Sequence, residues 1–146
     1  MSSKSHEYSR TCVCDVVHFI NDLQDAAVED SSCPTNCLNP VLGANREKHS
    51  HVNTRPFILY TKDGCAFEPF YKNHHFDSCD DFCEKSKFLR VENVEGCCAV
   101  VRVLKCVCEH HDGHSRVHFE ATDTCITLDL TDFIAIQCLE DTFVNL

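Results

Sequence analysis

The chain has 146 residues and a formal net charge of −10 at pH 7, and its residues are 43% hydrophobic and 25% charged. This is the length and composition of one globular domain, which excludes a disordered or collagen-like chain. The negative surface would repel phosphate groups, so we expect no nucleic acid and no membrane among the partners. No apolar run reaches the roughly 18 residues of a membrane span, and the polar start predicts no secretory signal.

The chain begins with a polar stretch and then an amphipathic segment. Residues 1–11 predict a flexible polar arm, and we expect residues 12–146 to form a single domain. Residues 12–29 have helical periodicity. The apolar stripe that marks its buried side contains Val13, Val16, Val17, Ile20, Leu23 and Ala27. Cys14 falls toward the polar side, so we expect it to face solvent or a neighbouring subunit, with Cys12 partly covered.

Beyond this helix, a turn at 33–37 and a loop over 38–55 lead to a series of short strands. Residues 57–61 and 65–71 predict one hairpin, and residues 88–94 and 97–105 predict a second across Glu95-Gly96. Residues 72–86 are polar, and residues 106–116 are expected to form a loop rich in Cys and His. Further strands are expected at 117–122, 124–130 and 133–139. The predicted fold is mainly β: a single β-sandwich-like domain with an N-terminal amphipathic α-helix.

Alternation along the last two strands assigns two cysteines to opposite environments. Cys125 shares a face with Asp129, whereas Ile126, Leu128 and Leu130 lie on the other face, so we expect Cys125 to be exposed. Cys138 shares a face with Ile134 and Ile136. We therefore expect Cys138 to be buried and to behave as a small hydrophobic residue.

The 13 cysteines are the most unusual feature of the composition. Because the number is odd, internal disulfides must leave at least one thiol for a neighbour, a metal or the free state. Such cysteine density is typical of small secreted scaffolds, yet this chain lacks a recognisable signal and is long enough to build a core. Metal ligands, redox chemistry and later oxidation of a protein made in the cytosol all remain open.

A metal site would have to use unusual spacings, because the C-x2-C pairs typical of structural zinc are absent. The best candidate ligands for Zn²⁺ or Cu lie in the expected 106–116 loop, with His118 beyond them. They are Cys106, Cys108, His110, His111 and His114. The alternative is a solvated loop that merely connects two strands.

Enzymatic interpretations have less support. The C-x-x-C motif of thiol redox enzymes, the G-x-S-x-G motif and glycine-rich phosphate loops are all absent. A thiol-reactive enzyme or redox sensor is kept as a third interpretation, but we expect neither catalysis nor a cofactor. What remains is cysteine as a cross-linker. The candidates are Cys12, Cys14, Cys33, Cys37, Cys79, Cys83, Cys97, Cys98, Cys106, Cys108 and Cys125.

Several long blocks resemble the CotY/CotZ/ExsY group of spore outer-coat and exosporium proteins of Bacillus. The block Asn53–Lys62 (NTRPFILYTK) resembles the central strand motif of that group. The other similar blocks, in the same order, are Asp15–Gln24, Cys33–Cys37, Leu89–Leu104 and Asp123–Leu139. Within these blocks and at their edge, the matching cysteines are Cys12, Cys33, Cys37, Cys97, Cys98, Cys125 and Cys138.

The resemblance implies a structural, cysteine-rich component of the endospore surface. It implies that residues 12–146 are a single spore-coat domain that self-assembles into an extended, disulfide-cross-linked lattice. The implied partners are further copies of the chain and other coat or exosporium proteins. Such proteins are made in the mother-cell cytosol and meet oxidant after lysis, which would reconcile a missing signal with many cysteines. The implied location is the outer coat or the exosporium.

Overall fold

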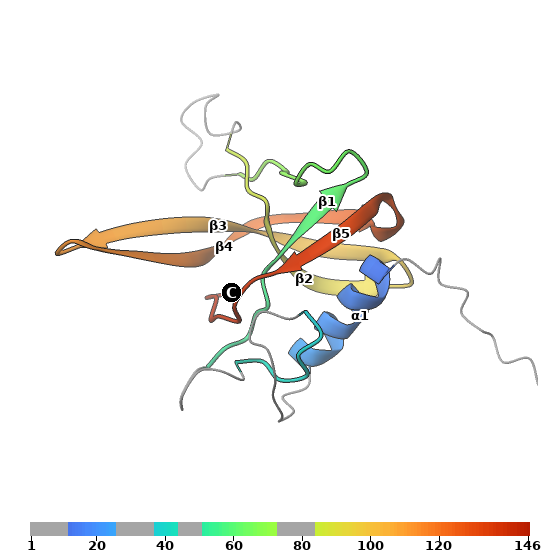
Figure 1. Ribbon diagram of the computed structural model, residues 1–146, viewed down its shortest axis with the longest axis horizontal. Helices are drawn as coiled ribbons and strands as arrows, with labels where there is room; N and C mark the ends of the chain where they lie inside the picture. Colours follow the sequence, from blue (N-terminus) through green and yellow to red (C-terminus); the bar gives the residue numbers. More distant parts are fainter. Residues whose placement is uncertain (1–11, 26–36, 44–50, 73–83) are drawn as a thin grey trace, which may run out of the picture.

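The computed structural model describes residues 12–25, 37–43, 51–72 and 84–146 (Figure 1). Over these residues the elements are one α-helix and five strands, with a short 3₁₀ helix before the last strand. In chain order they are α1 (Cys12–Asp25), β1 (Phe57–Thr61), β2 (Phe88–Glu95), β3 (Cys98–His111), β4 (His114–Asp129), η2 (Leu130–Asp132) and β5 (Phe133–Cys138). The predicted mainly β fold with an N-terminal amphipathic helix is confirmed. The described strands form one sheet, so the layer that packs on it is the helix and not the second sheet of a sandwich.

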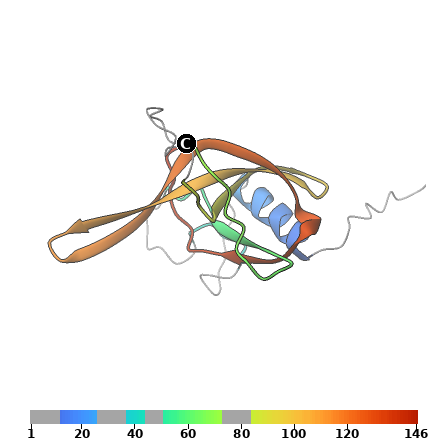
Figure 2. The same cartoon turned by 90° about the horizontal axis from the view of Figure 1, so that it is seen from above.

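The five strands form one antiparallel sheet in the order β4-β3-β2-β1-β5. The sheet curves around α1, which packs against it and supplies the second layer of the fold (Figure 2). The buried side chains of α1 include four residues of the predicted apolar stripe, Val13, Val17, Ile20 and Leu23. Cys14, expected on the polar side, is buried as well. No helix among the described residues is long and apolar enough to span a bilayer.

The core lies between this stripe and the concave face of the sheet. Its largest members are fully buried apolar residues of the strands, each contributing about 1.5–3 kcal/mol by leaving water. They include Phe57, Leu59, Leu89, Val91, Val101 and Val103. β3 contributes apolar residues along much of its length, which agrees with its interior position between β2 and β4.

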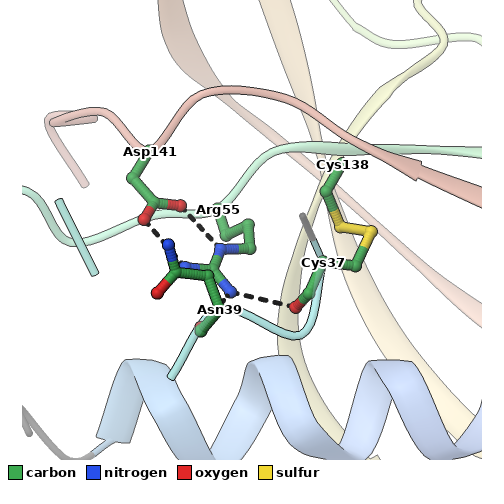
Figure 3. Close-up of a disulfide and its surroundings, with 5 residues drawn as sticks. All are labelled: Cys37, Asn39, Arg55, Cys138 and Asp141. Carbon is green, nitrogen blue, oxygen red and sulfur yellow. Dashed lines mark hydrogen bonds and ion pairs between the residues drawn. A yellow bond between two sulfur atoms is a disulfide. The ribbon is translucent and has the colours of Figure 1, made fainter. Parts of the chain in front are cut away.

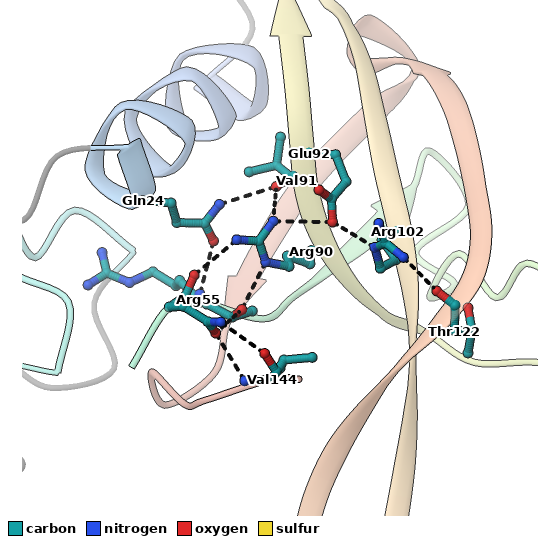
Figure 4. A network of polar contacts seen from close by, with 10 residues as sticks. Gln24, Arg55, Arg90, Val91, Glu92, Arg102, Thr122 and Val144 are labelled. Atoms are coloured by element: carbon teal, nitrogen blue, oxygen red, sulfur yellow. Dashed lines mark hydrogen bonds and ion pairs between the residues drawn. The ribbon is translucent and has the colours of Figure 1, made fainter. Parts of the chain in front are cut away.

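The backbones of β1 and β2 pair at one position, Phe57↔Leu89. Side-chain hydrogen bonds add further links between β2 and the residues that precede β1. Arg90 Nε donates to Thr54 Oγ1 at 2.9 Å and Arg90 Nη2 to the Asn53 carbonyl at 3.1 Å (Figure 4). Gln24, near the end of α1, donates to the Val91 carbonyl and accepts from the backbone N–H of Arg55. These bonds hold three parts together: the end of α1, the residues that precede β1, and strand β2.

The expectation of a loop at 106–116 is wrong, because these residues extend β3 and begin β4. Asp112 and Gly113 have φ of 50° and 78°, which is the geometry of a two-residue type I′ hairpin turn. Pairing with β2 ends at Phe88↔Leu104, while pairing with β4 continues from Lys105↔Glu120 to His111↔His114. Residues 105–120 therefore form a two-stranded hairpin that projects from the sheet (Figure 1), and we call this hairpin the arm.

Other sequence-based boundaries differ in smaller ways. The strands expected at 117–122 and 124–130 are one strand with a bulge, where three residues of β4 lie opposite Val103. The expected return strand at 65–71 forms only two isolated bridges, Tyr60↔Ala66 and Phe70↔Lys85. The first is supported by a hydrogen bond from Phe67 N to the Leu59 carbonyl. The expected arm at 1–11, the helix end at 26–29 and the turn at 33–36 lie outside the described residues.

Candidate functional site: bridged and exposed cysteines

Two disulfides connect distant parts of the chain. Cys14 is bonded to Cys97, 83 residues away, with a Cα–Cα distance of 5.5 Å. Cys37 is bonded to Cys138, 101 residues away, with a Cα–Cα distance of 5.2 Å. The first bridge ties the start of α1 to the β2–β3 turn, and the second ties the 37–43 segment to the end of β5. The first bridge therefore fixes the helix to the sheet, and the second fixes a connecting segment to an outer strand of the sheet.

The prediction that Cys14 faces solvent or a neighbour is wrong, because its exposed fraction is 0%. The turn between β2 and β3 covers this part of the helix, where His18 Nε2 is hydrogen-bonded to the Gly96 carbonyl. Helical periodicity finds the stripe that meets the sheet, but it does not show a turn closing over the adjoining side. The side chain of Cys12 lies outside the described part of the structure.

Cys138 is buried, as predicted, with an exposed fraction of 7%. The further expectation that it is a free small hydrophobic residue is wrong, because it is bonded to Cys37. Strand alternation reports the environment of a side chain. It carries no information on a covalent partner in a distant loop.

A fully buried arginine lies beside the Cys37–Cys138 bridge (Figure 3). Arg55 Nε and Nη2 donate to the two carboxylate oxygens of Asp141, at 2.7 and 2.9 Å. Nη1 donates to the carbonyls of Cys37 and Asn39, at 2.9 and 2.7 Å, and Nη2 also donates to the Val41 carbonyl at 3.2 Å. All the N–H groups of the guanidinium thus have an acceptor.

This arrangement holds the 37–43 segment against the C-terminal residues. Asp141 Oδ2 also accepts from the backbone N–H of Gly43 at 2.8 Å, so Asp141 holds one end of the segment while Arg55 holds the other at the Cys37 carbonyl. Sequence reasoning missed Arg55 as a structural residue. The available signal was a cation two residues before an apolar strand, within the Asn53–Lys62 block.

Five cysteines of the described residues are free and exposed: Cys65, Cys98, Cys106, Cys108 and Cys125. The predicted exposure of Cys125 is confirmed, and Leu128 and Leu130 on the other face are buried. Cys65 follows the turn after β1, Cys98 begins β3, and the remaining three lie on β3 and β4. Cys33, Cys79 and Cys83 lie outside the described residues.

The five candidate metal ligands are distributed over both faces of the arm. Alternation along β3 puts Cys106, Cys108 and His110 on one face and His111 on the other, directly opposite His114 on β4. The Cys108 Sγ and His110 Nε2 atoms are 3.8 Å apart, and His110 Nδ1 is hydrogen-bonded to Ser115. Within residues 12–25, 37–43, 51–72 and 84–146, no three His, Cys, Asp or Glu side chains are grouped as a metal site. A hairpin thus replaces the loop that the metal interpretation required.

Local electrostatics distinguish one of the arm thiols. Partial burial raises the pKa of Cys106, and the neighbouring Cys108 raises it further, while Lys87 opposes the shift. Because the thiolate is the reactive form, a raised pKa lowers the reactivity of Cys106 near neutral pH.

Alkylation should separate these two sets of cysteines in the folded, non-reduced protein. Iodoacetamide followed by mass mapping is expected to label Cys65, Cys98, Cys106, Cys108 and Cys125, and to label Cys14, Cys37, Cys97 and Cys138 only after reduction and unfolding. Cys106 labelling should accelerate as the pH is raised, because the thiolate fraction increases. Labelling of Cys14 or Cys138 before reduction would contradict the assigned bridges.

The fold and the cysteines of the described residues define a small mainly β protein with two internal bridges and several outward thiols. The family model of spore coat protein Z matches residues 1–141, and the chain belongs to this family. The chain is 34% identical over 144 residues to spore coat protein Z of Bacillus subtilis, covering 92% of this chain and 93% of that protein. No solved structure matches this chain.

Proposed function

We propose that this protein is a non-enzymatic building block that self-assembles into a disulfide-cross-linked layer at the surface of the bacterial endospore. The observation that carries the proposal is the division of the cysteines into two sets. Internal bridges stabilise the single chain, while five exposed thiols have no disulfide partner within the described residues. Membership of the spore coat protein Z family supports the spore coat as the location.

A rigid sheet is a suitable support for such thiols. Cys98, Cys106, Cys108 and Cys125 lie on strands, so their positions are fixed by the hydrogen-bonded ladder. Fixed positions restrict which thiols of neighbouring copies can meet, because a disulfide needs Cα atoms about 4.4–6.8 Å apart. Oxidation would then convert specific reversible contacts into covalent ones.

The sheet also offers edges at which copies can associate before oxidation. β4 and β5 are the outer strands of the described sheet, and each pairs with one neighbour. An edge strand presents unpaired N–H and C=O groups that can pair with another chain. In the proposed order of events the copies associate first, into an extended lattice, and disulfides follow.

The proposed setting is the outer coat or the exosporium, with other coat and exosporium proteins as further partners. Synthesis in the mother-cell cytosol would keep the outward thiols reduced during assembly, since cytosolic reductants keep thiols in the reduced form. Release of the spore would then expose the assembled layer to oxidant. This order of events would explain how a protein made in the cytosol can contain many cysteines that later form disulfides.

A five-fold serine variant tests this order of events. Replacing Cys65, Cys98, Cys106, Cys108 and Cys125 by serine leaves both internal bridges in place. The variant is expected to form ordered assemblies in negative-stain images. These assemblies should dissociate in detergent or on heating, under conditions in which assemblies of the oxidised wild-type protein persist. On a non-reducing gel, the ladder of disulfide-linked multimers should be weaker than for the wild-type protein.

Two outcomes would contradict the proposal in different ways. If the five-fold variant stays monomeric where the unchanged protein assembles, cross-linking causes assembly and the proposed order is wrong. If the unchanged protein stays monomeric under both reducing and oxidising conditions, the building-block function itself is wrong.

A further inference from the structure

The arm carries two exposed thiols that cannot bond to each other or to a cysteine opposite them. Cys106 and Cys108 are two residues apart on β3, so their Cβ atoms are about 6.6–6.8 Å apart, whereas a disulfide requires about 3.5–4.5 Å. On β4 they face Phe119 and Val117. Their bonding partner must therefore come from elsewhere.

The outer edge of β3 on the arm is open within the described residues. β2 covers this edge of β3 only as far as Leu104, which pairs with Phe88. The Leu104 carbonyl points to that edge, where it accepts a hydrogen bond from the Ser86 hydroxyl. Because backbone groups alternate along a strand, those of Cys106 and Cys108 point to the same edge.

The sequence along this edge is self-complementary. Lys105-Cys106-Val107-Cys108-Glu109 places a cation and an anion symmetrically about the two cysteines, with Val107 at the centre. If the segment pairs with a second copy of itself in antiparallel orientation about Val107, each Cys106 lies opposite a Cys108. Each Lys105 then lies opposite a Glu109, and opposite charges across a ladder stabilise pairing.

We infer that a second copy of this chain binds this edge, with a two-fold axis through Val107, and that two disulfides between Cys106 of one copy and Cys108 of the other close the contact. Residues opposite each other in a hydrogen-bonded antiparallel pair have Cα atoms about 5.5 Å apart, which is within the usual range for disulfides. Their Cβ atoms are about 4.5–5.5 Å apart, so forming each bond draws the two Cβ atoms together by about 1 Å. The two arms then form one four-stranded sheet. The same patch is used on both copies, as a two-fold contact requires.

The two neighbouring registers bring fewer cysteines together and lose the Lys105–Glu109 charge pairs. Centring the axis on Cys106 brings together one pair of thiols and places Lys105 opposite Val107. Centring it on Cys108 also brings together one pair and places Val107 opposite Glu109. Only the register centred on Val107 uses all four thiols and both charge pairs, over residues 105–109. Beyond them the second copy must leave the edge, because its residue 110 would face Leu104, which already pairs with Phe88.

The bond-forming step is thiol–disulfide exchange with a low-molecular-weight disulfide as the oxidant. One thiolate of the arm attacks the oxidant, forming a mixed disulfide and releasing one small thiol. The facing thiolate of the second copy then attacks the mixed disulfide and releases the second small thiol. Each bridge thus oxidises two cysteines and reduces one small disulfide to two thiols.

This inference rests on the proposed assembly, and a complementation experiment tests it separately. In full-length protein carrying Cys65→Ser, Cys98→Ser and Cys125→Ser, the variants Cys106→Ser and Cys108→Ser are made singly, one of them ¹⁵N-labelled. Proteins are oxidised with oxidised glutathione and digested with trypsin. The tryptic peptide 106–116 contains both cysteines, because Lys105 and Arg116 bound it.

The parent protein is expected to give a dimer of this peptide joined by two disulfides. When labelled and unlabelled copies are combined, part of this dimer should contain one labelled and one unlabelled peptide. Each single variant alone should lose the linked peptide, because both bridges need one Cys106 and one Cys108. Mixing the two variants should restore a single bridge between them. Lys105→Glu should reduce linking in the parent, measured on tryptic peptide 103–116 because the cleavage site at 105 is lost. Lys105→Glu with Glu109→Lys should restore linking, measured on peptide 103–109 because trypsin then cleaves after residue 109.

Linked peptide in either single variant alone, or no linked peptide in the mixture, would overturn the inferred register. If the parent protein assembles and cross-links through other cysteines without this peptide, the inference is wrong and the proposed function stands. If the parent forms no assemblies, the proposed function is wrong together with the inference.

Discussion

Replacing Arg55 by methionine is expected to lower the free energy of unfolding by about 3–5 kcal/mol, the loss typical when one partner of a buried ion pair is removed. The guanidinium is fully buried, and its removal leaves the Asp141 carboxylate without its cation and three backbone carbonyls without their donor. The measurement is urea unfolding followed by far-ultraviolet circular dichroism, with the free energy extrapolated to water.

Two further variants test whether burial of the Arg55–Asp141 ion pair causes the expected loss of stability. Asp132→Asn removes an exposed ion pair in which Lys62 Nζ and Asp132 Oδ1 are 3.9 Å apart, and it should change stability by less than about 1 kcal/mol. The double variant Arg55→Met, Asp141→Leu should lose less than the sum of its single variants, because neither buried charge remains unpaired. A loss of about 1 kcal/mol or less in Arg55→Met would contradict the structural role assigned to this arginine.

The parts of the fold that depend on local pattern could be predicted from the sequence. Apolar residues at helical spacing marked the buried stripe of α1, and alternation marked the opposite environments of Cys125 and Leu128. In both cases the signal and the environment involve residues a few positions apart. The mainly β class follows from the same kind of signal.

The arm shows how local pattern was misinterpreted. Polar and charged residues between 106 and 116 suggested a loop, but an alternating strand exposed on both faces has the same composition. Asp112-Gly113 was the stronger signal, because this dipeptide favours the positive φ angles of a tight hairpin turn. Treating Cys106 to His114 as one cluster also ignored that neighbours on a strand face opposite ways.

The pairing of the cysteines could not be predicted from the sequence. The bridged residues are 83 and 101 positions apart, and only the tertiary fold brings each pair together. The same holds for Arg55 and Asp141, whose contact joins residues 86 positions apart. Such contacts depend on tertiary packing, which a single sequence does not encode in any periodicity.

Removing the Cys37–Cys138 bridge is the second change with a large expected effect. Cys37→Ala and Cys138→Ala should each lower the free energy of unfolding by about 2–4 kcal/mol, because the unfolded chain gains conformational freedom when a long loop is opened. The double alanine variant should lose little more than either single variant, since both remove the same bond. Cys125→Ser is the matched control and should stay within about 0.5 kcal/mol, because its side chain is exposed and unbridged.

Serine distinguishes the two ends of this bridge, because Cys138 is buried whereas Cys37 is half-buried. At Cys138 the serine hydroxyl would be buried, and without a partner it would cost a further 1–3 kcal/mol or so relative to alanine. At Cys37 the hydroxyl can reach water, so serine and alanine should be nearly equal. Urea unfolding without reductant measures both differences. In dithiothreitol the parent protein should lose its advantage over the alanine variants, because its own bridges are then open. An unchanged advantage in dithiothreitol would show that packing at these positions, and not the covalent bond, stabilises the fold.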